Sequence, residues 1–106
     1  MTQDAWRDVD RYLSDLLARP DAALAETIES STREGLPQIE LAPTHAKLLH
    51  LLARMTRARR VLEVGTLGGY STIWLARAVP DDGMVVTLEG LQHHADVARA
   101  NIERAG

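Results

Sequence analysis

Apolar residues recur along the first half of this chain at the spacing of a helix, interrupted at positions that stop helices. Residues 4–18 carry an apolar side chain at every third or fourth position, with Asp and Arg between them, which predicts an amphipathic helix. Pro20 ends this helix, because a proline disfavours helix at the residue before it. A second helix is predicted from Asp21, as its N-cap, to near Gly35, and a third begins at Pro43 or the residue after it.

The pattern changes in the middle of the chain, where a short apolar run meets a glycine-rich turn. Residues 61–64 read Val-Leu-Glu-Val, which predicts a short, buried, parallel strand. Gly65 ends it, Gly68 and Gly69 follow, and helical spacing resumes over residues 70–79. This strand, turn and helix leave backbone N–H groups beside a spot where only small residues fit, so a polar or nucleotide-like ligand can approach the backbone.

A second strand and a last helix complete the pattern. Asp-Asp-Gly at 81–83 is a turn signal, residues 84–88 predict another buried strand, and apolar positions between Ala95 and Ala105 predict a helix that Gly106 closes. Two strands joined through a helix should be parallel, with a right-handed crossover. The sequence therefore predicts an α/β fold with three N-terminal helices followed by strand, helix, strand and helix.

Composition narrows the functional classes. The 106 residues suffice for one domain, and 45% hydrophobic with 25% charged residues is ordinary for a soluble globular protein. The net charge of −3 favours neither nucleic acid nor an anionic membrane as partner, and no apolar run has the length of a membrane span. Cysteine is absent, which excludes disulfides and thiolate chemistry. We expect a cytoplasmic protein.

Two glutamates are the strongest candidates for chemistry. Glu89 follows the second strand, 24 positions after Gly65, where a carboxylate can accept hydrogen bonds from both hydroxyls of a ribose. Glu63 lies inside an apolar strand, where a carboxylate is costly unless it is hydrogen-bonded or faces a cation. An exposed edge strand is the alternative explanation for Glu63, and we favour a functional role because the first strand of such a sheet is normally central.

Other candidate motifs are weaker. The dinucleotide fingerprint G-x-G-x-x-G fails because Leu67 occupies the place of its second glycine, and no Lys-Ser or Lys-Thr completes a P-loop. The histidine spacings do not place two imidazoles on one helix face, so we predict no metal site from His45, His50, His93 and His94. We interpret four arginines as a solvated cluster at a helix end, with a phosphate site as the alternative: Arg54, Arg57, Arg59 and Arg60. We expect the apolar stripe that contains Trp6 and Tyr12 to be core, with substrate or dimer contacts as the alternative.

The stretch Glu-Val-Gly-Thr-Leu-Gly-Gly-Tyr-Ser at 63–71, with Glu89 after a Val-Thr-Leu strand, resembles class I S-adenosylmethionine-dependent methyltransferases. More narrowly, it is similar to small-molecule O-methyltransferases of the catechol and caffeoyl-CoA type. Pro-Gln-Ile at 37–39 and Ala-Arg-Ala-Asn at 98–101 extend the resemblance to about residues 35–106. It implies a Rossmann-like fold, S-adenosylmethionine as cofactor, methylation of a hydroxyl on a small acceptor, aromatic in this family, and a homodimer.

The resemblance also implies a cofactor site. Glu63, Gly65 and Thr66 would line the methionine part, and Tyr70 and Ser71 would contact its amino-acid or sulfonium end. Glu89 would bind the ribose, Leu41 would wall the pocket, and Gly69 is also among the implied cofactor-binding residues. It divides the chain into a helical cap and dimerisation region, 1–58, and a cofactor-binding half, 59–106.

The sequence departs from the family in three places. His45-Ala46 stands where the family has a polar residue and then Gly, and Gly90-Leu91-Gln92 replaces the usual acidic residue and proline after the ribose-binding Glu. The family's metal ligands and catalytic groups have no counterpart in these 106 residues, so we expect the N-terminal half of a methyltransferase and name no catalytic or metal residue. The alternatives are a truncated non-catalytic module that binds cofactor or dimerises, and an NAD-dependent dehydrogenase, which Leu67 disfavours.

Overall fold

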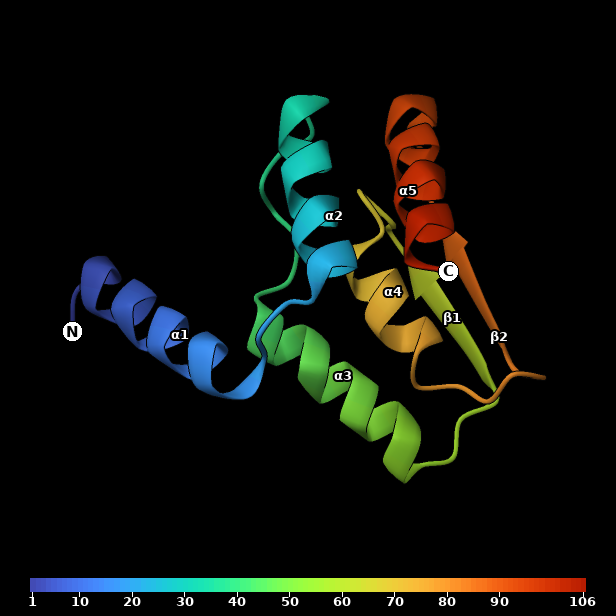
Figure 1. Cartoon of the computed structure of the whole chain (residues 1–106), viewed down its shortest axis with the longest axis horizontal. Coiled ribbons are helices and arrows are strands. Elements are labelled where there is room, and N and C mark those ends of the chain that lie inside the picture. The colour runs from blue at the N-terminus through green and yellow to red at the C-terminus, as the bar shows by residue number, and fades with distance from the viewer.

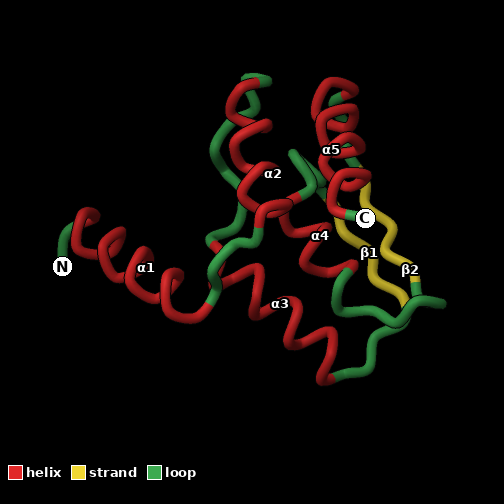
Figure 2. The backbone as a smooth tube through the Cα atoms, in the orientation of Figure 1, coloured by secondary structure: helices red, strands yellow, loops and turns green.

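The computed structural model describes all 106 residues as five helices and one two-stranded parallel sheet, shown in Figures 1 and 2. The order of elements is the one that the sequence predicts. Along the chain they are α1 (Gln3–Leu17), α2 (Ala22–Arg33), α3 (Pro43–Met55), β1 (Arg60–Val64), α4 (Tyr70–Ala76), β2 (Met84–Leu88) and α5 (Gln92–Ala105).

Local chemistry explains where the helices begin and end. The Thr2 and Asp21 side chains accept hydrogen bonds from backbone N–H groups in the first turns of α1 and α2. Gly35 follows α2 with φ +77°, a left-handed conformation that glycine adopts without a side-chain clash. Helix α4 ends at Ala76, three residues before the predicted end at Val79, because the chain turns there ahead of Pro80.

The two strands pair in parallel, as predicted, with Val61 opposite Val85 and Glu63 opposite Thr87. These four side chains are half-buried on the face of the sheet that α4 approaches, since Glu63 is hydrogen-bonded to residues of that helix. Both strands therefore direct their polar residue to the same layer.

The opposite face of the sheet corrects one prediction. We predicted that both strands are buried, but Leu62 is 67% exposed and Val64 80%, and Met84, Val86 and Leu88 are also exposed. A parallel sheet normally has both faces covered, and here the helices that follow each strand cover one face only. The outer face of this sheet is therefore apolar and exposed in these 106 residues.

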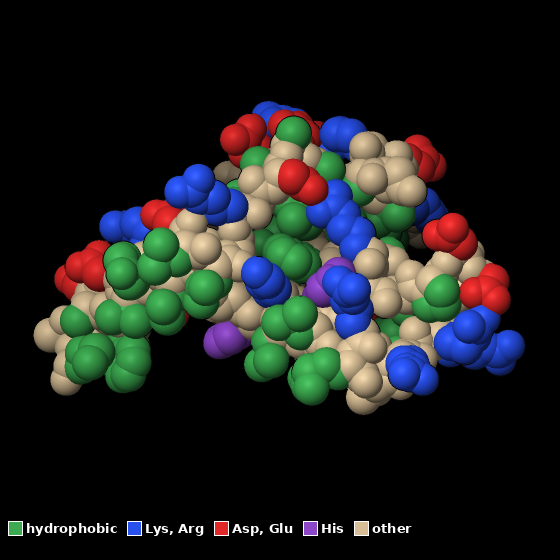
Figure 3. All heavy atoms as spheres, turned by 60° about the horizontal axis from the view of Figure 1, so that its bottom comes forward, with side chains coloured by type: hydrophobic (Ala, Val, Ile, Leu, Met, Phe, Trp, Pro, Cys, Tyr) green, Lys and Arg blue, Asp and Glu red, His purple; other side chains and the backbone are tan.

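Helix α1 corrects a second prediction. It has no buried residue, and its apolar stripe, which we expected to be core, is exposed. Figure 1 shows α1 extending away from the rest of the fold, next to α3, where Lys47 of α3 donates a hydrogen bond to the Leu17 carbonyl. In Figure 3, hydrophobic side chains gather over α1 and the adjoining α3. The exposed residues of α1 are Trp6, Val9, Tyr12, Leu13, Leu16 and Leu17, and those of α3 are Leu48, Leu49, Leu51, Leu52 and Met55.

The buried core is small and lies where α2, α3 and α4 meet. Leu24, Ala46, Tyr70 and Ile73 form it, and Ile102 of α5 is among the residues that pack against it. Helices α2 and α5 lie side by side above this core (Figure 1). The glycine-rich turn runs from the end of β1 to Tyr70, the first residue of α4, which belongs to this core. None of the helices has the length and apolar character that crossing a membrane would require.

Candidate functional site

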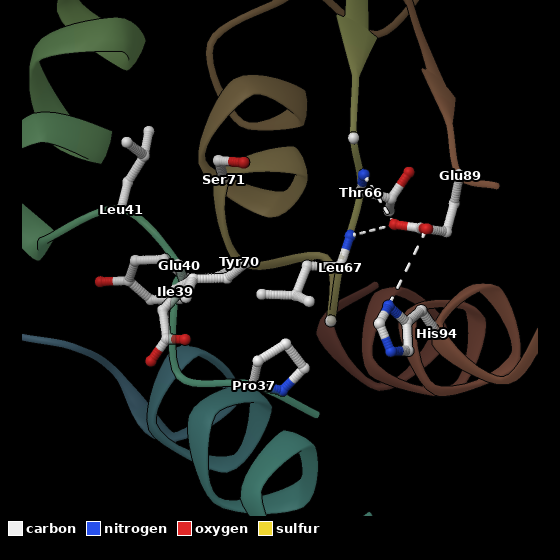
Figure 4. Close-up of a pocket in the computed structure, with 12 residues that line it drawn as sticks. Pro37, Ile39, Glu40, Leu41, Thr66, Leu67, Tyr70, Ser71, Glu89 and His94 are labelled. Atoms are coloured by element: carbon white, nitrogen blue, oxygen red, sulfur yellow. Dashed lines mark hydrogen bonds and ion pairs between the residues drawn. The ribbon is translucent and has the colours of Figure 1, made fainter. Parts of the chain in front are cut away.

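A cleft of about 320 Å³ opens beside the glycine-rich turn, at the carboxyl end of β1. Parallel α/β sheets bind ligands at this edge, because the loops that leave the strands converge there. Figure 4 shows the extended segment before α3 on one side of the cleft and Glu89 with His94 on the other. The lining residues are Pro37, Ile39, Glu40, Leu41, Gly65, Thr66, Leu67, Gly68, Tyr70, Ser71, Glu89 and His94.

Glu89 holds the glycine-rich turn through its carboxylate. One oxygen accepts hydrogen bonds from the backbone N–H groups of Leu67, at 2.8 Å, and Thr66, at 3.2 Å. The other accepts from the N–H of Leu91 at 3.1 Å, and it lies 3.9 Å from Nδ1 of His94. The hydrogen bond from Leu67, followed by those from Leu91 and Thr66, lowers the pKa of Glu89 below its ordinary value. The side chain is therefore ionised at neutral pH and puts a negative charge at the cleft.

Glu63 lies beneath the turn, behind the residues that line the cleft. Its carboxylate accepts hydrogen bonds from the hydroxyls of Ser71, Thr72 and Thr87 at 2.6, 2.5 and 2.8 Å. The Thr87 hydroxyl in turn meets that of Thr66 at 2.6 Å. These bonds satisfy the half-buried carboxylate, and they connect it to Ser71 and Thr66, which both line the cleft.

The structure brings most of the predicted site residues together. Leu41, Thr66, Tyr70, Ser71 and Glu89 line the cleft with Gly65. Gly65 has φ +91°, and a Cβ atom built there would meet no atom within 4 Å, so its backbone faces open space.

Gly69 and Glu63 are the predicted site residues that do not line the cleft. Gly69 is the residue before α4, with φ +88°, and it packs closely on Ile102, since a Cβ atom would lie 3.3 Å from its Cγ1. The requirement for glycine there comes from backbone conformation and from helix packing.

Sequence reasoning missed several lining residues. Sequence reasoning gave His94 no part in the site, yet it is half-buried in the first turn of α5 and directed toward Glu89. The available signal was its place five residues after Glu89, because a short connection returns the helix start to the same sheet edge. Glu40 had no such signal, since only the fold brings the segment before α3 across the turn.

The charges of the cleft indicate which ligands it suits. Glu40 and Glu89 contribute carboxylates, and none of the lining residues is Lys or Arg. Two N–H groups of the turn, which would have to bind a phosphate, already donate to Glu89. A cationic or neutral ligand therefore fits this cleft better than a phosphorylated one.

A metal site is not formed by these residues. No group of three or more His, Cys, Asp or Glu side chains lies close enough together to hold a metal ion. The resemblance implies a divalent metal only through residues outside these 106, and we derive no step through a metal.

A strand, glycine-rich turn and helix with an acidic residue after the next strand define a Rossmann-like nucleoside-binding unit. The family model described as O-methyltransferase matches residues 15–106, and the chain belongs to this family.

Individual relatives agree with this assignment. A catechol O-methyltransferase of Niastella koreensis is 47% identical over the whole chain, which covers 48% of that protein. The crystal structure of an O-methyltransferase from Bacillus cereus in complex with SAH has a TM-score of 0.92 at 50% identity, with 96% of this chain and 46% of that one covered. The O-methyltransferase TomG from Streptomyces achromogenes, in complex with SAM, gives 0.92 at 46% identity over 100% of this chain and 48% of the other. The chain thus spans about half the length of these relatives and has an incomplete form of the Rossmann-like class I methyltransferase fold.

Proposed function

We propose that this protein binds S-adenosylmethionine in the cleft at the glycine-rich turn and methylates a hydroxyl of a small acceptor. The observation that carries the proposal is the charge of the cleft: Glu40 and Glu89 are its acidic lining residues, and no Lys or Arg lines it. S-adenosylmethionine bears a sulfonium and an ammonium group, which this charge favours. A dinucleotide would bring a pyrophosphate to N–H groups that Glu89 already occupies.

Each predicted residue has a role consistent with its position. Glu89 accepts hydrogen bonds from the ribose hydroxyls, and Gly65 and Thr66 let the methionine part lie against the backbone. Leu41 forms an apolar wall. Gly69 acts through the shape of the turn, which it sets as the residue before α4.

Ser71 and Tyr70 contact the amino-acid end of the cofactor. Glu63 holds the Ser71 hydroxyl from behind, so its part in cofactor binding is to orient that group. Burial raises the pKa of the Tyr70 phenol, which keeps it neutral. S-adenosylmethionine supplies the methyl group when bound, and the residues of this chain contribute by positioning.

We propose a small, aromatic acceptor. Pro37, Ile39 and Leu41 give the cleft an apolar side next to the proposed cofactor site, and flat apolar molecules pack on such a surface. The name of the Niastella koreensis relative, a catechol O-methyltransferase, supports this substrate class.

Titration calorimetry tests cofactor binding directly. We expect the purified protein to bind S-adenosylmethionine, and Glu89→Ala to weaken binding at least tenfold, or about 1.4 kcal/mol. Glu103→Gln is the matched control, because Glu103 is exposed on α5 and does not line the cleft. Binding that Glu89→Ala leaves unchanged would refute the proposed site. Binding of NAD in place of S-adenosylmethionine would favour a dehydrogenase.

Methyl transfer needs a separate measurement. The whole protein is assayed, because the family's catalytic groups have no counterpart in these 106 residues. Transfer of a labelled methyl group to a catechol, with loss of transfer in Glu89→Ala, is the expected result. A protein that binds the cofactor and transfers no methyl group to any hydroxyl acceptor would favour the alternative, a non-catalytic cofactor-binding or dimerisation module.

We also propose a homodimer that forms through the helical region, residues 1–58, with cofactor binding assigned to residues 59–106. The exposed apolar stripe of α1 supports this proposal, because six large apolar side chains on one helix are costly to leave in water. Leu16→Lys should convert a dimer to a monomer in sedimentation equilibrium, while Asp15→Lys should not. A monomeric wild-type protein would refute the proposal.

The ordinary composition of the chain is consistent with a cytoplasmic location, which cell fractionation would test.

A further inference from the structure

A buried polar cluster lies behind the glycine-rich turn, on the side away from the cleft. Its centre is Asn101 of α5, which is 1% exposed. The Nδ2 group of Asn101 donates a hydrogen bond to the carbonyl of Gly68 at 2.8 Å. The Oδ1 atom accepts from the Ser30 hydroxyl of α2 at 2.5 Å and from the Arg104 guanidinium at 2.8 Å. One side chain thus joins α2, α5 and the turn.

The turn also packs tightly against the helix behind it. A Cβ atom built on Gly68 would lie 2.0 Å from Oγ of Ser31, the neighbour of Ser30 on α2. The turn therefore rests directly on α2, and only a glycine fits there. Figure 1 shows the turn, which leads from β1 to α4, in the space between α2 and α5.

The turn is held from two sides by different residues. On the cleft side, Glu89 accepts from the N–H groups of Thr66 and Leu67. On the other side, Asn101 donates to the carbonyl of Gly68, which lines the cleft. These bonds fix the backbone of residues 66–68 from both sides, which leaves the turn few conformations. The backbone is therefore arranged before a ligand binds.

We propose that Asn101, oriented by Ser30, is a positioning residue that sets the glycine-rich turn for the cofactor. This inference rests on the proposed function, because the turn is the backbone against which S-adenosylmethionine would lie. Through Ser30, helix α2 of the N-terminal region contributes to cofactor affinity without touching the cofactor. Loss of the Asn101 bond frees the Gly68 carbonyl, and cofactor binding must then order the turn.

The test compares cofactor affinity with stability in three variants. Asn101→Ala removes the bond to Gly68, and Ser30→Ala removes one of the two donors that hold Oδ1 of Asn101, leaving Arg104 in place. Val97→Ala is the matched control, because Val97 is also buried on α5 and gives no hydrogen bond to the turn. The dissociation constant for S-adenosylmethionine is measured by calorimetry, the unfolding midpoint by circular dichroism, and KM and kcat with a catechol as acceptor.

We expect Asn101→Ala to raise the dissociation constant and the KM for S-adenosylmethionine about tenfold, and Ser30→Ala about threefold, with kcat at saturating cofactor unchanged. The two effects should not add in the double variant, because they act through one bond. Val97→Ala should lower the unfolding midpoint and leave the dissociation constant unchanged.

Three outcomes would overturn the inference. One is an Asn101→Ala protein that is folded and binds the cofactor as tightly as the wild type. Another is a Val97→Ala protein that loses affinity in proportion to its stability, since the role of Asn101 would then be purely structural. If Asn101→Ala does not fold, unchanged affinity in Ser30→Ala decides against the inference. A wild-type protein that binds no S-adenosylmethionine would instead refute the proposed function.

Discussion

Replacing Glu89 with glutamine tests whether the charge of this carboxylate holds the glycine-rich turn. The substitution keeps the size of the side chain and removes the charge. The carboxylate accepts from the N–H groups of Thr66, Leu67 and Leu91. An amide has one acceptor oxygen, so its NH₂ group must face at least one backbone N–H, and that donor is left without a partner.

The cost follows from these three bonds. A hydrogen bond to a charged group contributes about 1 kcal/mol more than a neutral one, and a donor left unsatisfied costs about 1–3 kcal/mol. The side chain is 15% exposed, and water compensates part of this loss. We therefore expect Glu89→Gln to lower the free energy of unfolding by about 2–3 kcal/mol at pH 7.

The pH dependence gives the prediction a sharper form. The folded-state pKa of Glu89 lies below the ordinary value of 4.5, so its stabilisation is complete above pH 4.5 and is lost as the pH falls through the lowered pKa. Urea denaturation of both proteins from pH 7 down to pH 3 should show the difference in unfolding free energy shrinking toward zero. A difference that is the same at every pH would refute the reasoning, because a charge would then not be its cause. The control Glu103→Gln should change stability by less than about 0.5 kcal/mol.

Three further substitutions test other parts of the structure by thermal or urea denaturation. Glu63→Gln should cost at most about 1 kcal/mol, less than Glu89→Gln, because hydroxyl partners can reverse and accept from an amide whereas backbone N–H groups cannot; an equal or larger cost would contradict this. Asp21→Ala should cost about 1 kcal/mol, because Asp21 caps α2 through the N–H of Leu24, and Asp21→Asn should retain most of that cap. Gly68→Ala should cost about 1–3 kcal/mol by its clash with Ser31, and adding Ser31→Ala should recover part of the loss; no recovery would place the strain elsewhere.

The sequence by itself determined the elements and the chemistry of the turn. The spacing of apolar residues, together with proline, glycine and aspartate at the boundaries, predicted every helix and strand, because these signals act within a few residues. The pattern from Glu63 to Ser71, with Glu89 after the next strand, indicated the family to which the chain belongs. Six of the eight predicted site residues line one cleft. Five of them, all but Leu41, do so because a parallel strand, its turn and the end of the next strand lie at one edge by local connectivity.

Only the tertiary structure decided what each apolar or polar face meets. The stripe of α1 and the outer face of the sheet have the pattern of buried surfaces, yet both are exposed, because periodicity shows that a face is apolar and not whether another layer covers it. Glu40 lies in the cleft because the segment before α3 crosses the glycine-rich turn, a contact between segments distant in sequence. Glu63 lies behind the cleft wall, where Ser71, Thr72 and Thr87 hold its carboxylate. The bond that joins Ser30 to Asn101 spans 71 positions. No local pattern encodes such a pairing, because it depends on how α2 and α5 pack around the turn.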